Sequence, residues 1–170
     1  MAIDLIYYGH ETLKKVAEEV SNIDGELIDF IDSMFNVMYR SRGIGLAAPQ
    51  VDKSRRVVTL DIDDDKKNIV MEMINPVIRE FSKKEEPYEE GCLSVPRIMG
   101  EVVRPAEISV TYLDRDGKKI DLEAKGLLAR VIQHEVDHLN GILFVDHLED
   151  YTRNELRPEL KKIKKLNRRP

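Results

Sequence analysis

Two histidines and a glutamate near residue 135 have the spacing of a metal site. His134 and His138 lie four residues apart, and Glu135 directly follows the first histidine, giving the segment HEVDH. On a helix, residues four positions apart lie on the same face, one turn apart. Two imidazoles so placed can bind one metal ion, and the adjacent carboxylate can take a proton from a metal-bound water. The pattern predicts metal-assisted hydrolysis, with an amphipathic helix carrying two chance histidines as the alternative.

A third ligand decides what kind of metal site this is. The metzincin pattern requires a histidine three residues after Gly141, where this chain has Phe144, so that class is excluded. A better candidate is Cys92, the only cysteine, which lies upstream in the segment EGCLS. One thiolate and two imidazoles leave a fourth coordination position open for water, as in catalytic sites. A buried, inert cysteine remains the alternative for this residue. Weaker candidates for the third ligand are His147, Glu149, Glu155 and Glu159.

Composition and charge limit the class of protein. The 170 residues, 42% of them hydrophobic and 35% charged, are typical of one globular domain with its own core, here residues 1–170. A single cysteine allows no intrachain disulfide, which fits a cytoplasmic protein. We expect no membrane association, because the start resembles no signal peptide and no apolar run is long enough to span a bilayer. Residues 151–170 carry eight basic and two acidic residues, a net +6 within a chain of net charge −5.

Hydrophobic periodicity predicts the elements that must position these residues. We expect helices over about 26–42 and 127–139, the second ended by Asn140-Gly141, and a short helical turn within 11–20. Pro158 is expected to open a C-terminal helix. Strands are predicted at 56–62, 69–74, 102–104, 108–113 and 119–124, with Asn75-Pro76 ending the second. The charged stretch 82–90 is expected to be solvated and residues 95–100 to form a loop. This order predicts an α+β fold, with antiparallel or mixed strands around the central HExxH helix and a helix at the C-terminus.

The glycine-rich segment 43–50, GIGLAAPQ, formally matches the dinucleotide-binding pattern. That motif needs a strand before it and a helix after it. Here a helix precedes it, and Pro49 prevents a regular helix from continuing, so we expect no nucleotide cofactor. The two glycines can instead let backbone groups approach a ligand closely, or simply connect helix to strand. Gln50 adds a side-chain amide that can donate a hydrogen bond into a site.

Three segments together resemble the signature motifs of the peptide deformylases. These are GIGLAAPQ at 43–50, EGCLS at 90–94 and QHEVDHLNG at 133–141, in that family's order and spacing. The resemblance extends along nearly the whole chain. It implies a metal-dependent hydrolase that removes the N-formyl group from the formyl-methionine of newly synthesised polypeptides and releases formate. It also implies one divalent ion per chain, with Fe²⁺ as the physiological metal and Zn²⁺, Ni²⁺ or Co²⁺ as substitutes.

The same resemblance assigns roles to individual residues. The metal ligands would be Cys92, His134 and His138, and Glu135 would be the general acid/base. Gln50 and the backbone N–H of Leu93 would form the oxyanion hole. Backbone groups at Ile44, Gly45 and Gly91 would line the bound peptide.

The chemistry of the residues fits these roles. Metal-bound water or hydroxide would attack the formyl carbon, while Glu135 accepts a proton and returns it to the leaving amine. Leu127, one to two turns before His134, is placed to line an apolar pocket for the methionine side chain. We expect Arg104 to pair with Glu90, with Asp137, or with both, and so to orient the site. The two basic residues Arg97 and Arg130 depart from the family pattern, and we expect both to extend into solvent, with substrate contact as the alternative.

Three other functions remain open from the sequence. They are an HExxH metallopeptidase of another class, a thiol hydrolase with Cys92 as the nucleophile, and a binding module stabilised by a metal with His147 as a fourth ligand. The basic segment 151–170 has two interpretations. It is either a docked helix with a solvated basic face or a contact surface for the ribosome, which the family resemblance implies.

Overall fold

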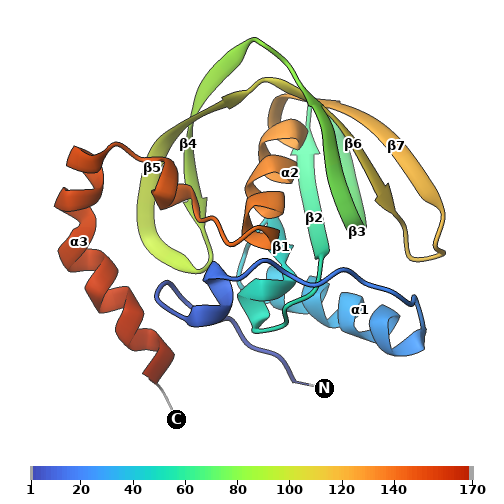
Figure 1. The fold of residues 1–170 in the computed structure, drawn as a ribbon, viewed down its shortest axis with the longest axis horizontal. Coiled ribbons are helices and arrows are strands. Elements are labelled where there is room, and N and C mark those ends of the chain that lie inside the picture. Colours follow the sequence, from blue (N-terminus) through green and yellow to red (C-terminus); the bar gives the residue numbers. More distant parts are fainter. Residues whose placement is uncertain (1, 169–170) are drawn as a thin grey trace.

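The computed structural model describes residues 2–168, which form two antiparallel sheets and three α-helices (Figure 1). In chain order the elements are α1 (Gly25–Arg40), β1 (Gly45–Ala47), β2 (Val57–Asp64), β3 (Lys67–Phe81), β4 (Glu85–Cys92), β5 (Val95–Pro105), β6 (Glu107–Leu113), β7 (Lys119–Lys125), α2 (Gly126–Leu139) and α3 (Asp150–Lys164). Short 3₁₀ helices lie at Glu11–Lys14, Ala48–Val51, Phe144–His147 and Lys165–Arg168. The predicted α+β class is confirmed, and all strand pairs within the sheets are antiparallel.

The central helix α2 lies between the two sheets. The larger sheet has the strand order β1-β2-β3-β6-β7, and β4 and β5 form the smaller one. One side of α2 buries Val131, Ile132 and Leu139 in a core cluster with residues of the larger sheet. Figure 1 shows β4 and β5 beyond the other side of the helix. Side chains of α2 that face away from the larger sheet can therefore meet residues of β4 and β5.

The ends of α2 follow the predicted pattern. Gly141 has a φ of +76°, and its N–H donates to the carbonyl oxygen of His138. A Cβ at Gly141 would also lie 2.5 Å from the carbonyl oxygen of Lys14, so only glycine fits there. The Arg56 guanidinium donates to the carbonyl oxygen of Leu139 at 2.9 Å. A cation at the C-terminal end of a helix stabilises the exposed carbonyl groups and the helix dipole.

The N-terminal helix α1 forms much as the sequence predicts, from 25 to 40. The Asp24 side chain caps it by accepting from the N–H of Leu27 at 2.9 Å. Ile31, Met34 and Met38 form part of its buried stripe and pack into a second core cluster with residues of β1, β2 and β3. The helical turn expected within 11–20 is limited to the 3₁₀ helix at 11–14.

Strand β3 passes through the point where we expected it to end. Asn75 has a φ of +51°, and its side chain exchanges two hydrogen bonds of 2.9 Å with the backbone of Val20. Pro76 lies where the pairing with β6 shifts register, between Ile74 and Val77. A bulge tolerates a residue without an N–H, so the strand continues to Phe81.

The stretches expected as a solvated excursion and a loop are the two paired strands β4 and β5. Residues 85–89 are indeed exposed, but Glu90 is buried. In β5 the positive φ of Arg97, +68°, interrupts the inward–outward alternation, which is why residues 95–100 do not read as a strand. Because β4 is highly charged and the first half of β5 is irregular, neither segment shows the alternating hydrophobic pattern that predicts a strand.

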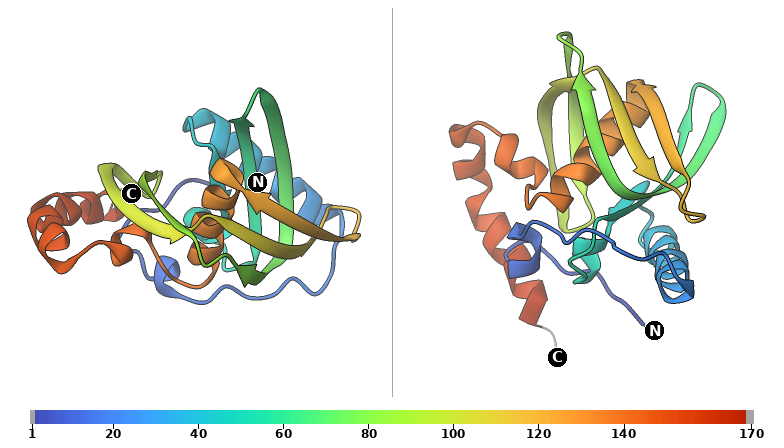
Figure 2. Two further views of the ribbon diagram at one scale, coloured as in Figure 1. Left: turned by 90° about the horizontal axis from the view of Figure 1, so that it is seen from above. Right: turned by 45° about the vertical axis from the view of Figure 1, so that its right-hand side comes forward.

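The C-terminal helix α3 begins at Asp150, and Pro158 lies inside it instead of at its first turn. Of the apolar residues ahead of Pro158, Leu156 is only partly buried, so the strong hydrophobic pattern starts only after the proline. Leu160 and Ile163 pack against a cluster that includes Val95 and Phe144. Figure 2 shows α3 at the outer side of β5, away from β7. Among residues 2–168 no helix has the length and apolar character needed to cross a bilayer.

Candidate metal centre and active site

A thiol and two imidazoles from different elements meet beside α2. Cys92 ends β4, and His134 and His138 lie one turn apart on α2; their three ligand atoms all lie within 4.8 Å of one another. The Sγ atom of Cys92 is 3.4 Å from Nε2 of His138. Metal bonds of about 2.3 Å to sulfur and about 2.0 Å to nitrogen, at a tetrahedral angle, would separate these atoms by about 3.5 Å. The donor set and its spacing therefore fit a divalent ion such as zinc or iron.

The orientation of His134 is fixed by a buried carboxylate. Glu90 accepts from Nδ1 of His134 at 2.9 Å. Burial raises the pKa of Glu90, but hydrogen bonds from His134 and Arg104 outweigh it and hold that pKa well below its usual range. An ionised carboxylate only accepts, so the ring hydrogen lies on Nδ1 and leaves Nε2 available as the ligand atom. Burial lowers the pKa of His134, but hydrogen bonds with Cys92 and Glu90 raise it well above its usual value, so a proton and a metal ion compete for this imidazole.

His138 is in the form that binds metals. It is fully enclosed on α2, and burial lowers its pKa well below the usual value, with the positive charges of His134 and Arg104 acting in the same direction. A neutral imidazole results, which has a free lone pair for coordination. Its Nδ1 atom is buried without a hydrogen-bond partner among residues 2–168.

The carboxyl group of Glu135 lies in the same cavity. The residue is 5% exposed, and its Oε1 atom has no hydrogen-bond partner within residues 2–168. Burial raises the pKa of Glu135 to about 7, against the opposing charge of His134. A group with this pKa can both accept and return a proton near neutral pH. Gly45 allows the carboxyl group this position, since a Cβ there would lie 2.6 Å from Oε2 of Glu135.

A side-chain amide faces the cysteine from the other direction. Gln50 is 1% exposed, and its Oε1 accepts from the backbone N–H of Ala47 at 2.9 Å. That donor identifies the oxygen, so the Nε2 group points to Ser94 Oγ at 3.2 Å and Cys92 Sγ at 3.4 Å. Gln50 belongs to the 3₁₀ helix that follows β1 and begins with Ala48-Pro49. Leu93 lies beside it in the tight turn between β4 and β5.

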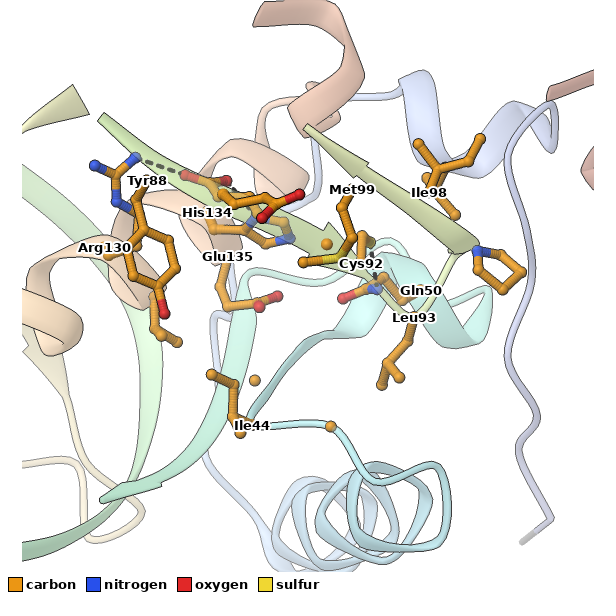
Figure 3. A pocket seen from close by; sticks show the side chains of 18 of the residues that line it. Ile44, Gln50, Tyr88, Cys92, Leu93, Ile98, Met99, Arg130, His134 and Glu135 are labelled. Carbon is orange, nitrogen blue, oxygen red and sulfur yellow. Dashed lines mark hydrogen bonds and ion pairs between the residues drawn. The ribbon is translucent and has the colours of Figure 1, made fainter. Parts of the chain in front are cut away.

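A cavity of about 460 Å³ lies beside two of the three ligand candidates, Cys92 and His134, whereas His138 does not line it (Figure 3). Its walls include all four residues predicted to contact the substrate, namely Ile44, Gly45, Gly91 and Leu127, together with Gln50, Cys92, Leu93, His134 and Glu135. Gly91 keeps the wall flat, because a Cβ there would lie 2.5 Å from Sδ of Met99. Sequence reasoning missed Met99 and Tyr88, which also line the cavity. The position of Tyr88 two residues before Glu90 would have identified it once β4 was recognised as a strand.

The predicted pairing of Arg104 is confirmed for both partners. Arg104 donates to Glu90 through Nε at 2.7 Å and Nη2 at 3.0 Å, and to Asp137 Oδ2 through Nη1 at 2.8 Å. His147, the weaker ligand candidate, instead contacts Asp137 Oδ2 through Nε2 at 2.8 Å. The ligand group found within residues 2–168 includes neither His147 nor the three glutamate candidates, Glu149, Glu155 and Glu159.

The prediction for Arg130 was wrong. Its side chain is 9% exposed and does not extend into solvent. It donates to Glu90 Oε2 at 2.8 Å, to the carbonyl oxygen of Val102 at 2.8 Å and to that of Glu86 at 2.6 Å. Two of these acceptors belong to β4, which was not predicted as a strand, and the third, Val102, lies in the part of β5 that was predicted. Without the pairing of β4 with β5, no acceptor for the guanidinium could be named. Arg97 is exposed, as expected.

Comparison with known proteins identifies the family. The family model described as polypeptide deformylase matches residues 3–154. A peptide deformylase of Brachyspira hyodysenteriae is 42% identical over 181 residues, which cover 99% of this chain and 97% of that protein. One from Treponema pallidum is 46% identical and covers 90% of this chain and 92% of its own.

Solved structures agree with the sequence comparison. The crystal structure of a peptide deformylase from Legionella pneumophila superposes with a TM-score of 0.88 at 44% identity, covering 99% of each chain. That of a Synechococcus elongatus peptide deformylase in complex with actinonin gives a TM-score of 0.86 at 44% identity, covering 94% of this chain and 86% of that one. The chain therefore belongs to the polypeptide deformylase family, the metal-dependent hydrolases that remove the N-formyl group from newly made polypeptides.

Proposed function

We propose that this chain performs the deformylase reaction with one divalent ion, Fe²⁺ under physiological conditions, held by Cys92, His134 and His138. The observation that carries the proposal is the convergence of their ligand atoms within 4.8 Å, beside the buried carboxyl group of Glu135. A soft thiolate with two imidazoles suits iron, zinc, cobalt or nickel. The family resemblance favours iron among these metals.

Hydrolysis would need an activated water and a group that transfers its proton. The bound ion would act as a Lewis acid that lowers the pKa of water and so supplies hydroxide at neutral pH. Glu135 would accept the proton from this water and pass it to the leaving amine, a task that suits its pKa of about 7. Water is then added across the formyl C–N bond, which breaks to give formate and a free N-terminal amine.

Gln50 and Leu93 would stabilise the charge that develops on the formyl oxygen. The Nε2 group of Gln50 and the backbone N–H of Leu93 would donate to this oxygen. One such donor is worth about 3–4 kcal/mol in the transition state. Because the N–H of Ala47 already holds Oε1 of Gln50 at 2.9 Å, the amide needs no reorientation during the reaction.

The substrate would be the N-terminal formyl-methionine of a nascent polypeptide. Backbone groups of Ile44, Gly45 and Gly91 would line its main chain, and Leu127 would contact its first side chain. All four residues border the cavity that contains His134 and Glu135. An extended N-terminus that enters this cavity would bring its formyl group to the ligand cluster.

The rival functions are less consistent with these contacts. A peptidase with a downstream ligand would need His147 or one of the glutamates at 149, 155 and 159. His147 is instead hydrogen bonded to Asp137, and no glutamate belongs to the ligand group within residues 2–168. The Cys92 thiol contacts an imidazole and an amide donor at 3.4 Å each, which suits a ligand next to an oxyanion site. A thiol hydrolase would keep its activity after complete removal of metal, and a deformylase would lose it.

Metal loading provides the test of this proposal. Protein prepared anaerobically with iron should bind one ion per chain and release formate from a formyl-methionyl tripeptide faster than zinc-loaded protein. Replacing Cys92, His134 or His138 by alanine should abolish stoichiometric metal binding. As a control, His10→Ala removes an imidazole elsewhere and should leave the metal content unchanged. Equal rates with iron and zinc would contradict the iron preference. Full turnover after chelation would contradict the metal site.

We further propose that residues 1–170 act as one catalytic domain in the cytoplasm, with 151–170 as a basic segment that contacts the ribosome. This segment has a net charge of +6, and its lysines at 161, 162, 164 and 165 are exposed on and just after α3. Neutralised phosphates release counterions, so ribosome affinity should fall steeply with salt. Changing the four lysines to glutamine should weaken ribosome binding and leave tripeptide turnover unchanged. If ribosome affinity is unchanged, the segment is only a solvated helix.

A further inference from the structure

One wall of the active-site cavity is an aromatic ring held by a cation. Tyr88 lies on β4 two residues before Glu90, and Arg130 lies on α2 one turn before His134. The Cζ atom of Arg130 is 5.5 Å from the centroid of the Tyr88 ring, which is a cation–π distance. Both residues line the cavity, and Figure 3 shows them next to each other at the end of the cavity away from Gln50 and Leu93.

Arg130 is a rigid support for this ring. Its guanidinium donates to Glu90 and to the backbone carbonyl oxygens of Val102 and Glu86, so it is fixed to both β4 and β5. By contrast, Tyr88 is 51% exposed, and no hydrogen bond within residues 2–168 holds its hydroxyl group. The stacking on Arg130 is therefore the contact that sets the direction of the ring.

Helix α2 also contributes two aliphatic side chains to the lining of the cavity. Leu127, two turns before His134, and Val131, one turn before Glu135, line the same cavity as Tyr88 and Arg130. Aliphatic side chains attract a thioether and a straight hydrocarbon chain about equally. An aromatic ring distinguishes the two, because sulfur makes a favourable contact about 5 Å from a ring.

We propose that Tyr88, positioned by Arg130, is a specificity-determining residue that recognises the sulfur atom of the substrate's first side chain. The guanidinium stacks against one face of the ring, which leaves the edge and the other face for a thioether in the cavity. This inference rests on the proposed function, since it assumes that the first residue of a formylated peptide lies beside the ligand cluster. It adds a discrimination between methionine and a side chain of the same length without sulfur.

The test compares two peptides that differ only at this atom. Formyl-methionyl and formyl-norleucyl tripeptides are assayed with iron-loaded protein, and the ratio of their kcat/KM values is measured. Tyr88→Leu should lower this ratio about two- to tenfold, the range that a sulfur–aromatic contact supplies. Tyr88→Phe retains the ring and should retain the ratio. Tyr88→Val is the second aliphatic variant, for use if Tyr88→Leu does not fold.

A double-mutant cycle tests whether Arg130 acts through the ring. Arg130→Gln should lower the methionine-to-norleucine ratio in the parent protein and have no further effect on it in the Tyr88→Leu background. A merely structural role would slow both peptides equally and leave the ratio unchanged. Tyr151→Leu removes an exposed tyrosine of α3 outside the cavity and serves as the matched control.

The outcomes separate this inference from the proposed function. If the parent protein releases formate and Tyr88→Leu leaves the ratio at its parent value, Tyr88 does not recognise sulfur. If Arg130→Gln changes the ratio equally in both backgrounds, Arg130 does not act through Tyr88. If the parent protein releases formate from neither peptide, the proposed function itself fails.

Discussion

Replacing Glu90 by glutamine should be among the most destabilising single changes near the metal centre. The side chain keeps its shape but loses the negative charge that faces three donor residues. Oε1 accepts from Arg104 Nη2 and His134 Nδ1, and Oε2 accepts from Arg104 Nε and Arg130 Nη1. A glutamine retains one acceptor oxygen and turns an NH₂ group toward the other two donors.

The size of the effect follows from these contacts. Two of the four hydrogen bonds are lost, and hydrogen bonds to charged groups contribute about 1.5–3 kcal/mol each. The expected loss is therefore about 3–6 kcal/mol, which agrees with about 3–5 kcal/mol for removing one partner of a buried ion pair. Little solvent screening applies, since the side chains of Glu90 and Arg104 are 3% and 6% exposed.

Chemical denaturation of the metal-free protein measures this loss. Both proteins are treated with a chelator, so that weaker metal binding does not add to the difference in unfolding free energy. Glu86→Gln, on the exposed part of the same strand, is the matched control and should lie within about 0.5 kcal/mol of the parent. If Glu90→Gln lowers the unfolding free energy by less than about 1 kcal/mol, the hydrogen bonds of Glu90 with arginine and histidine do not stabilise the fold as described.

The same variant should also bind metal more weakly. His134 would lose the carboxylate that fixes its Nδ1–H, and such partners are typically worth 10- to 100-fold in metal affinity. Competition with a chromophoric chelator measures this change. An unchanged affinity would mean that Glu90 does not support His134 as a ligand.

Three further changes probe the oxyanion site, the wall beside Glu135 and the core. Gln50→Ala should lower kcat about 100- to 1000-fold at unchanged metal content, because one oxyanion donor is lost; a kcat near that of the parent contradicts this role. Gly45→Ala introduces a Cβ 2.6 Å from Oε2 of Glu135, and displacing that group should cost about 100-fold in turnover, whereas unchanged turnover would show that the carboxyl group tolerates the shift. Ile132→Ala removes a fully buried side chain of α2 and should lower the unfolding free energy by about 2–5 kcal/mol in denaturation, and a loss below 1 kcal/mol would contradict the packing described.

The helices and the ligand candidates could be predicted because their signals are local. On a helix, the four-residue spacing puts His134 and His138 on the same face, and Gly141 marks where that helix ends. Only one cysteine was available as a third ligand, so Cys92 could be named without knowing the fold. Its meeting with the histidines depends on contacts between β4 and α2 that no local pattern encodes.

Strand β4 and the first half of β5 were not predicted, although residues 102–104 of β5 were predicted as a strand. The charged residues of 82–90 have the pattern of a solvated loop, although the last of them, Glu90, is the buried partner of two arginines and a histidine. Hydrophobicity cannot distinguish such a buried, paired carboxylate from an exposed one. Arg130 was misplaced for the same reason, since a basic residue reaches a buried position only when its acceptors are known.

Two element boundaries predicted at prolines, Pro76 and Pro158, were wrong. A proline lacks an N–H group, so the sequence predicts a boundary at each of them. In β3 a bulge with left-handed Asn75 accommodates Pro76, and the strand continues. In α3 the helix extends on both sides of the exposed Pro158. Tertiary context overrides the local preference in both elements.

Formate release by the iron-loaded protein and its Glu135→Gln variant tests the catalytic site most directly. The substrate is a formyl-methionyl tripeptide, and the metal content of both proteins is measured in the same samples. Glutamine keeps the shape of the side chain but cannot carry the proton, so turnover should fall by about 100- to 10,000-fold at one metal ion per chain. A fully loaded variant that releases formate at the parent rate would contradict the role of Glu135.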